Sequence, residues 1–279
     1  MYSKSKLMCS TIITIIITVL ILSSVAALSG ATTNIIIYQQ QQQQEALATQ
    51  GNTGRAPVTN PACGQVVEGL VELNSDLNCI GDGLIIGADG TTIRLNGHTI
   101  RGTGPDSSKV GISVGNEVGV RIEGKGTIEQ FQAGILASGA KGTSISSVTL
   151  RENQIAVFSN GMEDLQAMQN KMTQNSIGLA SHSSSGLGLT KNVITGNQLA
   201  GITLVATDDS IISNNDVKES QNGIYVDSGS NGNKIESNDV LENELDLNNA
   251  NGLAINVNSN SFSDNNCETS NPSGLCTTT

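Results

Sequence analysis

The sequence is poor in aromatic and basic residues. It has no tryptophan, three tyrosines and three phenylalanines among 279 residues, so large rings cannot build its core. Its 31 glycines and many branched aliphatic residues instead suit narrow, tightly stacked coils. The 14 Lys and Arg are outnumbered by 25 Asp and Glu, which gives a formal net charge of -11. Because nucleic-acid binding requires clustered bases, we expect no nucleic-acid partner.

The segment from Met1 to Ala27 has the composition of an export signal. Lys4 and Lys6 precede an uncharged run from Leu7 to Leu22, and small residues follow up to Ala27. The sequence predicts cleavage after Ala27; the alternative is an uncleaved membrane anchor, because the uncharged stretch has about the length that a bilayer needs. Residues 28–62, which include a glutamine run at 39–44, are predicted to form a flexible low-complexity linker. We expect a secreted or cell-surface protein that contacts a membrane only through an uncleaved N-terminal segment.

A short pattern recurs from Gly111 to Asn265 with a period of roughly 22 residues. One apolar column of the repeat contains Ile112, Ile135, Val157, Leu179, Ile202, Ile224 and Leu247. A second apolar column, which follows the first at a constant offset in most repeats, contains Ile128, Leu150, Met172, Ile194, Val217, Val240 and Phe262. Near-constant spacing of like side chains is typical of a repeat architecture in which each unit stacks on the previous one.

Asparagines give a third periodic signal. Those just before the second apolar column are Asn170, Asn192, Asn215, Asn238 and Asn260. Those just after it are Asn153, Asn175, Asn197, Asn243 and Asn265, with Ser220 at the one gap. Asparagine tolerates the left-handed geometry of turns, and stacked side-chain amides can bond to one another. We interpret both sets as structural ladders rather than as a glycan-binding surface.

The residues inside each repeat favour strands over helices. Segments such as Gly201 to Val205 and Gly223 to Val226 are short, β-branched and bounded by Gly, Asn, Asp and Ser. Parallel stacking of such coils would place column members about 4.8 Å apart and join the aliphatic columns into one core. The sequence therefore predicts an all-β chain, a single parallel β-helix of about nine coils over residues 63–266, with a capping segment at its start and a tail at 267–279.

The run from Gly81 to Ile100, Gly-Asp-Gly-Leu-Ile-Ile-Gly-Ala-Asp-Gly-Thr-Thr-Ile-Arg-Leu-Asn-Gly-His-Thr-Ile, resembles the first coils of NosD-like β-helix proteins. The repeats as a whole resemble the right-handed parallel β-helix shared by pectate-lyase-like proteins. This resemblance implies a right-handed solenoid and raises two possible activities, carbohydrate chemistry and copper handling. The insert at 103–109 is the only sizeable loop that we expect to leave the coils, and we interpret it as a plain turn rather than a binding finger.

Cysteine usage agrees with an exported protein. Cys9 lies within the predicted signal, which leaves Cys63, Cys79, Cys267 and Cys276. Three pairings are formally possible, and the two local ones, Cys63 with Cys79 and Cys267 with Cys276, are favoured because each pair flanks one end of the repeats. Metal binding by the four cysteines is the alternative, although neither pair has the close spacing typical of thiolate zinc sites.

Acidic residues supply the candidate metal site. Glu219, Glu242 and Asp264 recur after the second apolar column, and Asp216 and Asp239 recur before it. Carboxylates stacked at strand spacing repel each other by roughly 1 to 4 kcal/mol per pair. Calcium would relieve that repulsion because it accepts oxygen ligands in flexible geometry. Splayed, solvated side chains are the default interpretation, calcium is the alternative, and no cofactor is required.

The candidate catalytic residues are two acidic pairs, Glu163 with Asp164 and Asp208 with Asp209. They share a column but lie two coils apart, about 10 Å, with Ser185 and Gly186 between them. That separation is at the upper end of the range for an inverting carboxylate pair, and no Arg or Lys column is expected beside them. Tyr225 is the one clear outward aromatic residue that could stack on a sugar.

Copper handling would need imidazole or soft ligands. His98 and His182 are far apart in coil order, Met172 belongs to the core, and only Met162 and Met168 could approach His182. We therefore expect a non-catalytic element that presents a polar, acidic face to an extracellular glycan or protein. A polysaccharide lyase or glycoside hydrolase is the alternative, and a NosD-like copper accessory protein is the third possibility.

Overall fold

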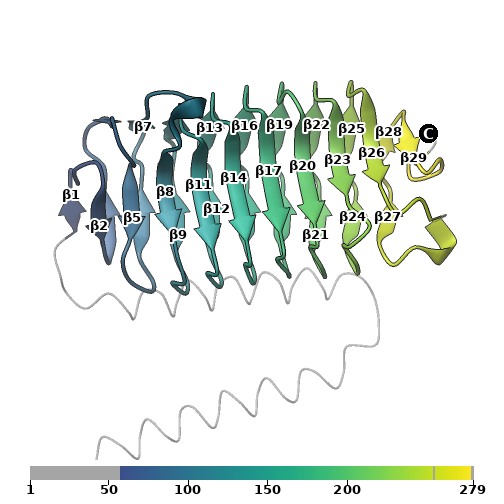
Figure 1. The fold of residues 1–279 in the computed structure, drawn as a ribbon, viewed down its shortest axis with the longest axis horizontal. Helices are drawn as coiled ribbons and strands as arrows, with labels where there is room; N and C mark the ends of the chain where they lie inside the picture. The colour runs from purple at the N-terminus through teal and green to yellow at the C-terminus, as the bar shows by residue number, and fades with distance from the viewer. Residues whose placement is uncertain (1–56, 254, 278–279) are drawn as a thin grey trace, which may run out of the picture. The chain divides into compact units, whose positions relative to one another are not determined.

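The computed structural model describes residues 57–253 and 255–277 (Figure 1). The predicted signal at 1–27 and nearly all of the predicted linker lie outside these residues. Within them the chain forms a right-handed parallel β-helix, as the repeat predicts. No helix in the described ranges is long and apolar enough to cross a membrane.

Each coil contributes one strand to each of three parallel sheets, which we call A, B and C. Sheet A contains β1 (Val58–Thr59), β3 (Leu70–Glu72), β6 (Thr92–Arg94), β9 (Arg121–Glu123), β12 (Ser144–Ser146), β15 (Gln166–Met168), β18 (Gly188–Thr190), β21 (Ile211–Ser213), β24 (Lys234–Glu236) and β27 (Ser261–Ser263). Sheet C contains β4 (Leu77–Asn78), β7 (Thr99–Arg101), β10 (Thr127–Glu129), β13 (Thr149–Arg151), β16 (Lys171–Thr173), β19 (Val193–Thr195), β22 (Asp216–Lys218), β25 (Asp239–Leu241) and β28 (Asn266–Cys267). The neighbouring strands pair in parallel, and like positions of successive coils are in register.

Sheet B has the longest strands. It contains β2 (Gln65–Val67), β5 (Leu84–Ile86), β8 (Val110–Val114), β11 (Ala133–Ser138), β14 (Ile155–Asn160), β17 (Ile177–His182), β20 (Ala200–Val205), β23 (Asn222–Val226), β26 (Leu245–Asn249) and β29 (Ser270–Asn271). Two short 3-10 helices, η1 (Pro105–Ser107) and η2 (Ile255–Val257), lie in loops that leave the coils, so the prediction of a single such loop was wrong. The strands of sheet B are stacked side by side in Figure 1.

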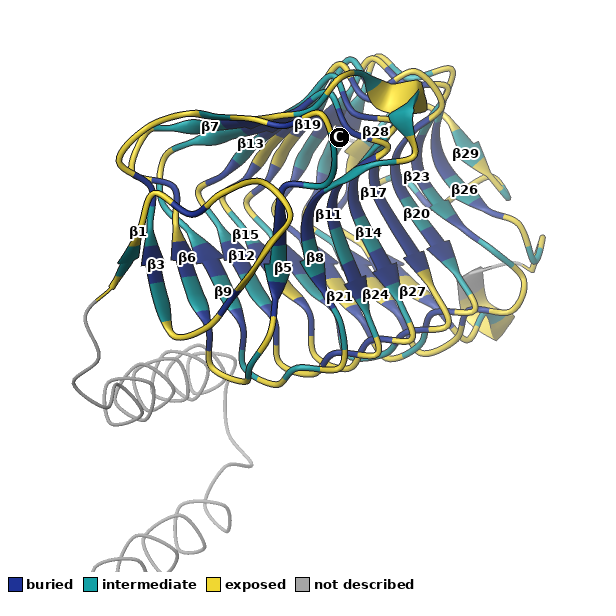
Figure 2. Cartoon of the chain, turned by 60° about the vertical axis from the view of Figure 1, so that its left-hand side comes forward, coloured by how far each residue is buried: buried dark blue, intermediate teal, exposed yellow. Residues whose placement is uncertain are grey.

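The core is a set of stacked aliphatic columns. The first predicted column is confirmed throughout, because Ile112 pairs with Ile135 and the pairing continues in sheet B to Leu247. The second predicted column is confirmed in sheet C from Ile128 to Val240. Members of both columns are almost fully buried, and the inward-facing parts of the strands are dark in Figure 2.

The last member of the second column was predicted wrongly. Val240 pairs with Cys267, whereas Phe262 pairs with Ile235 in sheet A. The loop that carries η2 lengthens this coil, so that stacked ladder residues are 27 apart in sequence where 22 or 23 is usual. Phe262 lies one usual period after Val240 in the sequence. A prediction that assumes a constant period therefore assigns Phe262 to this column, although the longer coil places Cys267 there.

Two buried asparagine ladders run along the corners of the helix. At the corner between sheets A and C, each of Asn170, Asn192, Asn215 and Asn238 donates from its backbone N–H and from Nδ2 to Oδ1 of the next ladder residue. At the corner between sheets C and B, the ladder runs from Asn153 through Asn175 to Asn197, then Ser220 and Asn243. The prediction of structural ladders is confirmed.

The η2 loop also changes two ladder assignments. Asn265 accepts from Asn238 and so ends the ladder between sheets A and C, not the other one. Asn260 accepts from Asn233, which places it in a third, shorter ladder that begins at Ser210. Both residues are buried, but each belongs to a different corner from the one predicted.

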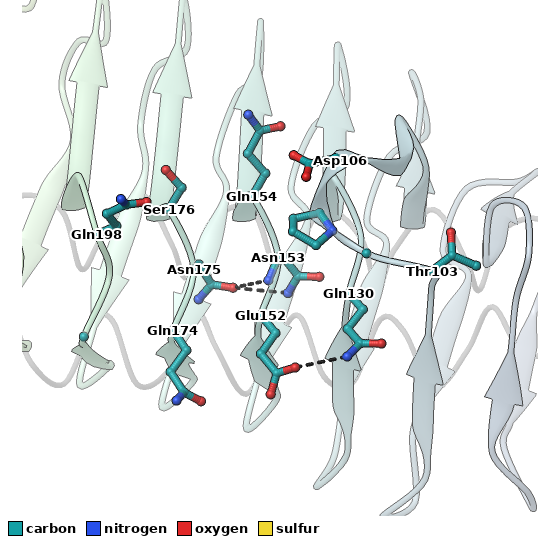
Figure 3. Close-up of a pocket in the computed structure, with 13 residues that line it drawn as sticks. Thr103, Asp106, Gln130, Glu152, Asn153, Gln154, Gln174, Asn175, Ser176 and Gln198 are labelled. Carbon is teal, nitrogen blue, oxygen red and sulfur yellow. Dashed lines mark hydrogen bonds between the residues drawn. The ribbon is translucent and has the colours of Figure 1, made fainter.

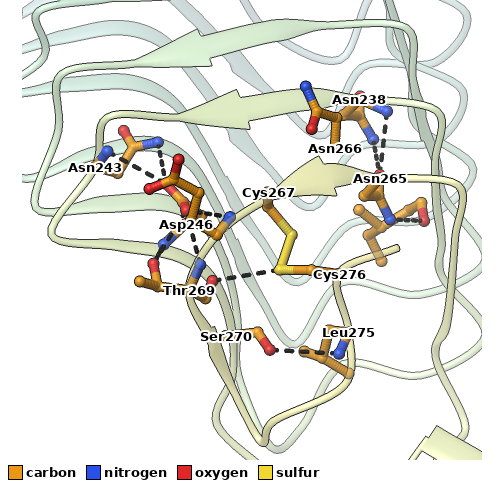
Figure 4. The surroundings of a disulfide bond; sticks show 12 residues. Asn238, Asn243, Asp246, Asn265, Asn266, Cys267, Thr269, Ser270, Leu275 and Cys276 are labelled. Carbon is orange, nitrogen blue, oxygen red and sulfur yellow. Dashed lines mark hydrogen bonds between the residues drawn. A yellow bond between two sulfur atoms is a disulfide. The ribbon is translucent and has the colours of Figure 1, made fainter. Parts of the chain in front are cut away.

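Both ends of the described helix carry a disulfide. Cys63 pairs with Cys79, and Cys267 pairs with Cys276 (Figure 4 shows the second bond), which confirms the local pairing. Two such bonds are typical of a periplasmic or extracellular compartment. The strands extend past the predicted boundaries of 63 and 266, because β1 pairs with β3 inside the predicted linker and β29 pairs with β26 inside the predicted tail.

Candidate functional site

An open groove of about 660 Å³ follows the corner between sheets C and B (Figure 3). Its floor is the buried asparagine ladder at Asn153 and Asn175. Two walls flank the floor: Gln130, Glu152, Gln174 and Gly196 on the sheet C side, and Gln154, Ser176 and Gln198 on the sheet B side. All of them adjoin a ladder asparagine except Gln130, which precedes Phe131. The groove therefore spans four successive coils.

The wall on the sheet C side owes its shape to backbone conformation. Gln130, Glu152 and Gln174 all have a positive φ, between 55° and 60°, so the chain turns sharply after each strand of sheet C. Such left-handed residues direct their side chains away from the core. Gln130 Nε2 donates to Glu152 Oε2 at 3.1 Å, so the amide and the carboxylate of neighbouring coils are linked along the wall.

The floor presents little free hydrogen-bonding capacity. Asn175 Nδ2 donates to Leu150 O at 3.1 Å and to Asn197 Oδ1 at 2.9 Å, while its Oδ1 accepts from Asn153. These groups are engaged in holding neighbouring coils together. Ligand contacts in this groove therefore fall to the glutamines of the walls, Ser176, Glu152 and the residues at its N-terminal end.

The insert at 103–109 bounds the groove at that end. Gly104 N donates to Gln130 O at 2.9 Å, and Lys109 O accepts from Gln132 N at 2.9 Å, so both ends of the insert are tied to the next coil. Gly104 has a φ of 132°, which favours glycine, and the η1 turn then places Pro105 and Asp106 against the groove. The insert is a short turn, as predicted, and it also lines the groove, which the sequence did not indicate.

A buried carboxylate lies just outside the groove. The side chain of Glu129 is 2% exposed and accepts from Arg101 Nε at 2.5 Å and from Arg151 Nε at 2.6 Å. The two arginines occupy the coils on either side of Glu129 in sheet C. Arg151 also lies 3.7 Å from Glu152, so its charge is shared between two carboxylates. These arginines form ion pairs between neighbouring coils and do not form a cationic pocket.

The five acids predicted to bind calcium do not form one row. Asp216 and Asp239 are stacked as predicted, but Lys218 Nζ lies 3.0 Å from Asp216 and 3.3 Å from Asp239. Hydrogen bonding to Asp216 raises the pKa of Lys218. Sequence spacing had missed Lys218, which relieves the repulsion of this pair without a metal.

The remaining three acids, Glu219, Glu242 and Asp264, lie away from Asp216 and Asp239 and do not form a single row. Glu219 and Glu242 continue the groove wall on the sheet C side, where Glu219 N donates to Glu242 O. Asp264 follows β27 at the corner between sheets A and C, because of the longer η2 coil. In the described ranges no three His, Cys, Asp or Glu side chains converge in a way that could hold a metal.

We expect Lys218→Met to lower the free energy of unfolding by about 0.5 to 1 kcal/mol at low ionic strength, because Asp216 and Asp239 would then face each other without a cation. The loss should shrink at high ionic strength, which screens exposed charges. Thermal or denaturant unfolding at two salt concentrations measures it. Lys171→Met, also on sheet C, is the control, and an equal loss in both variants would contradict this role.

The candidate catalytic acids are spaced as predicted and remain apart. Glu163, Ser185 and Asp208 are bridged in order along one corner column, so the two carboxylates lie two coils apart. Asp164 and Asp209 have φ values of 57° and 51° and serve as turn residues. No column of Arg or Lys was predicted beside these acids, and the structure places a single lysine, Lys141, next to Glu163.

Lys141 precedes Glu163 in the same column, and its Nζ lies 2.6 Å from Glu163 Oε2. The hydrogen bond from Lys141 lowers the pKa of Glu163. That direction is the opposite of the one that a general acid at neutral pH requires. Asp208 Oδ1 accepts from Asn231 N at 2.7 Å. Each acid is thus committed to a local partner.

The outward aromatic residues lie on sheet B. Tyr225 is outward as predicted, and Phe158 in the same outward row was missed. Both are partly buried by their neighbours in adjacent strands. The signal for Phe158 was available, because it follows the buried Val157 in a strand whose side chains alternate.

The donor set does not fit a copper site. His98 Nδ1 lies 3.4 Å from Asp76, and His182 Nδ1 lies 3.2 Å from Asn160, so each imidazole has a local partner. Met162 and Met172 are buried in the core, and the four described cysteines form disulfides. Copper sites need such ligands to converge, and these do not.

The structure defines the protein as a right-handed parallel β-helix with an amide-lined groove. The chain belongs to the NosD family, whose description is periplasmic copper-binding protein, and residues 85–275 match the family model. A search of curated proteins gives no significant match.

Several solved structures are similar to this chain at low identity. The enzymatically active domain of tailspike protein 2 of bacteriophage CBA120 is 15% identical, with a TM-score of 0.44 over 77% of this chain and 38% of that one. A periplasmic alginate epimerase is 16% identical, with a TM-score of 0.46 over 74% of this chain and 69% of that one. The A-module of the mannuronan C-5 epimerase of Azotobacter vinelandii is 14% identical, with a TM-score of 0.34 and 77% coverage of each chain. This chain thus spans well under half of the tailspike domain.

Proposed function

We propose that this NosD-family protein is an exported, non-catalytic β-helix that binds an extracellular glycan in the groove between sheets C and B. The observation that carries the proposal is the row of amides on a rigid support, with Gln154, Gln174 and Gln198 exposed and Gln130 half-buried. A primary amide both donates and accepts hydrogen bonds, as does a sugar hydroxyl. Because the ladder holds the backbone, a row of amides on it can meet a polyhydroxylated chain with little backbone rearrangement.

Several features argue against catalysis and copper delivery. Among the acids outside the groove, Glu163 pairs with Lys141, Asp216 pairs with Lys218, and Asp208 accepts from a backbone amide. Within the groove, Glu152 accepts from Gln130. The two imidazoles have separate local partners, Met162 and Met172 are buried in the core, and the four described cysteines form disulfides. The two disulfides support export, because such bonds persist in oxidising compartments.

We expect the protein to bind one or more polysaccharides on a glycan array without releasing reducing sugar or unsaturated uronate. The double substitution Gln154→Ala with Gln198→Ala should weaken binding at least about tenfold, since two lost hydrogen bonds of about 1 kcal/mol each exceed the roughly 1.4 kcal/mol that tenfold requires. Isothermal titration calorimetry measures the change. Gln166→Ala, an exposed residue of sheet A, is the control.

Two results would contradict the proposal. Binding that is unaffected by the groove substitutions would place the glycan elsewhere. Product release from any polysaccharide by the purified protein would favour the enzymatic alternative, and substitution of Glu163 or Asp208 would then show whether the column at that corner is responsible.

A further inference from the structure

The charge around the groove is negative. Among the residues that line it, Asp106 and Glu152 are acidic and none is Lys or Arg. The nearest arginines, Arg101 and Arg151, are held by Glu129. The lining residues thus carry two carboxylates and no cation, so an acidic polysaccharide in contact with them would meet repulsion.

The same wall becomes more acidic along the helix. Glu219 and Glu242 occupy, on the next two coils, the place that Gln174 and Gly196 hold in the groove. A longer polyanionic chain lying in the groove and continuing past Gln198 would therefore pass further carboxylates. The wall on the sheet C side disfavours uronates on both coils beyond the amide row.

The wall has a regular step. Gln130, Glu152, Gln174 and Gly196 lie on successive coils, and neighbouring strands are spaced by about 4.8 Å. An extended glycan advances by a similar distance per sugar residue. The groove, closed at its N-terminal end by the insert at 103–109, spans about 14 Å over its three intervals. Three or four sugar residues fill that length.

We infer that the ligand is a neutral, linear glycan that lies along the helix axis, with successive sugar residues against successive coils, and that Asp106 and Glu152 exclude polyuronates. This inference rests on the groove being the glycan site proposed above. Gln154 and Gln198 would contact hydroxyl groups of sugars two coils apart, whereas the carboxylates would reject a uronate at the closed end.

The test compares neutral and acidic oligosaccharides, from disaccharides to hexasaccharides, by calorimetry. The probes are cello-, manno- and galacto-oligosaccharides against oligogalacturonates and alginate oligomers. We expect at least one neutral series to bind about tenfold or more tightly than either acidic series, with affinity that rises up to the tri- or tetrasaccharide and then levels off. The preference should weaken in high salt, which screens the carboxylates.

The double substitution Asp106→Asn with Glu152→Gln tests the cause of the preference. We expect the neutral-to-acidic affinity ratio to fall from about tenfold or more to about twofold. An unchanged denaturation midpoint would show that the variant is folded. Gln154→Ala with Gln198→Ala should instead weaken binding of the neutral series, while neutral oligosaccharides still bind more tightly than acidic ones.

The outcomes separate this inference from the proposed function. One outcome is that acidic oligosaccharides bind through the same glutamines as tightly as neutral ones. That result would overturn the inference of a neutral ligand but would still support the groove as a glycan site. Affinity that keeps rising beyond the tetrasaccharide would overturn the alignment with the coils. Binding of neither class would overturn both, and an unchanged ratio in the double variant would remove the role given to Asp106 and Glu152.

Discussion

Asn192→Ala is expected to lower the free energy of unfolding by about 3 to 4 kcal/mol. Asn192 is 1% exposed and lies in the middle of the ladder between sheets A and C. Its Oδ1 accepts from both N and Nδ2 of Asn170, and its Nδ2 donates to Ala167 O and to Asn215 Oδ1 at 2.9 Å each. Alanine removes these four hydrogen bonds and leaves buried groups on both neighbouring coils unsatisfied.

Urea or guanidinium denaturation of the purified variant measures this loss. Asn116→Ala, at an exposed residue outside the ladders, should change the free energy of unfolding by less than about 0.5 kcal/mol. Asn192→Asp is the sharper variant, because it keeps the two acceptor contacts but can donate neither to Ala167 nor to Asn215. A loss below about 1 kcal/mol for Asn192→Ala would show that the ladder contributes little to stability.

Asp246→Ala is expected to cost about 3 to 5 kcal/mol and to release the last coil. Asp246 is 1% exposed, and stands where the preceding coil has Gly223. Its Oδ1 accepts from N and Nδ2 of Asn243, and its Oδ2 accepts from the backbone amides of Glu268 and Thr269 and from Thr269 Oγ1, each at 3.0 Å (Figure 4). A carboxylate thus ends the ladder where the chain no longer supplies an asparagine.

Hydrogen exchange distinguishes local from global loss in this variant. We expect faster exchange of the amides of residues 266–277 in Asp246→Ala, together with a lower denaturation midpoint. Asp246→Asn keeps one acceptor but places an amide donor against backbone N–H groups, so it should lie between wild type and Asp246→Ala. Unchanged exchange at Glu268 and Thr269 would exclude the capping role.

Much of the fold was predictable because stacking imposes a period on the sequence. Ile112 and Leu247 are separated by six coils and still lie in one column, since every coil between them has nearly the same length. The prediction failed at Phe262, Asn260, Asn265 and Asp264 for a single reason. The chain leaves the coil after Asn249 and returns to it at Asn260, and an excursion of this kind can have any length without breaking the periodic columns on either side.

The groove was harder to predict than the fold. Gln154 and Gln198 carry no chemistry that marks them in a sequence, and similar glutamines occur at ordinary turns. The periodic acidic residues indicated a charged site, yet Lys141 pairs with Glu163 and Lys218 pairs with Asp216. The two signals that could have indicated a site were the insert at 103–109 and the recurrence of a glutamine directly beside a ladder asparagine.

The equivalence of the coils has a consequence for how this molecule can change over evolutionary time. Removal or duplication of one complete turn would rejoin Asn to Asn and Ile to Ile at every corner, whereas removal of half a turn would join unlike residues. The groove between sheets C and B would then become longer or shorter by one whole coil. Homologous members of the family should therefore differ in ligand length by integral amounts, because the scaffold has no means of stretching between rungs.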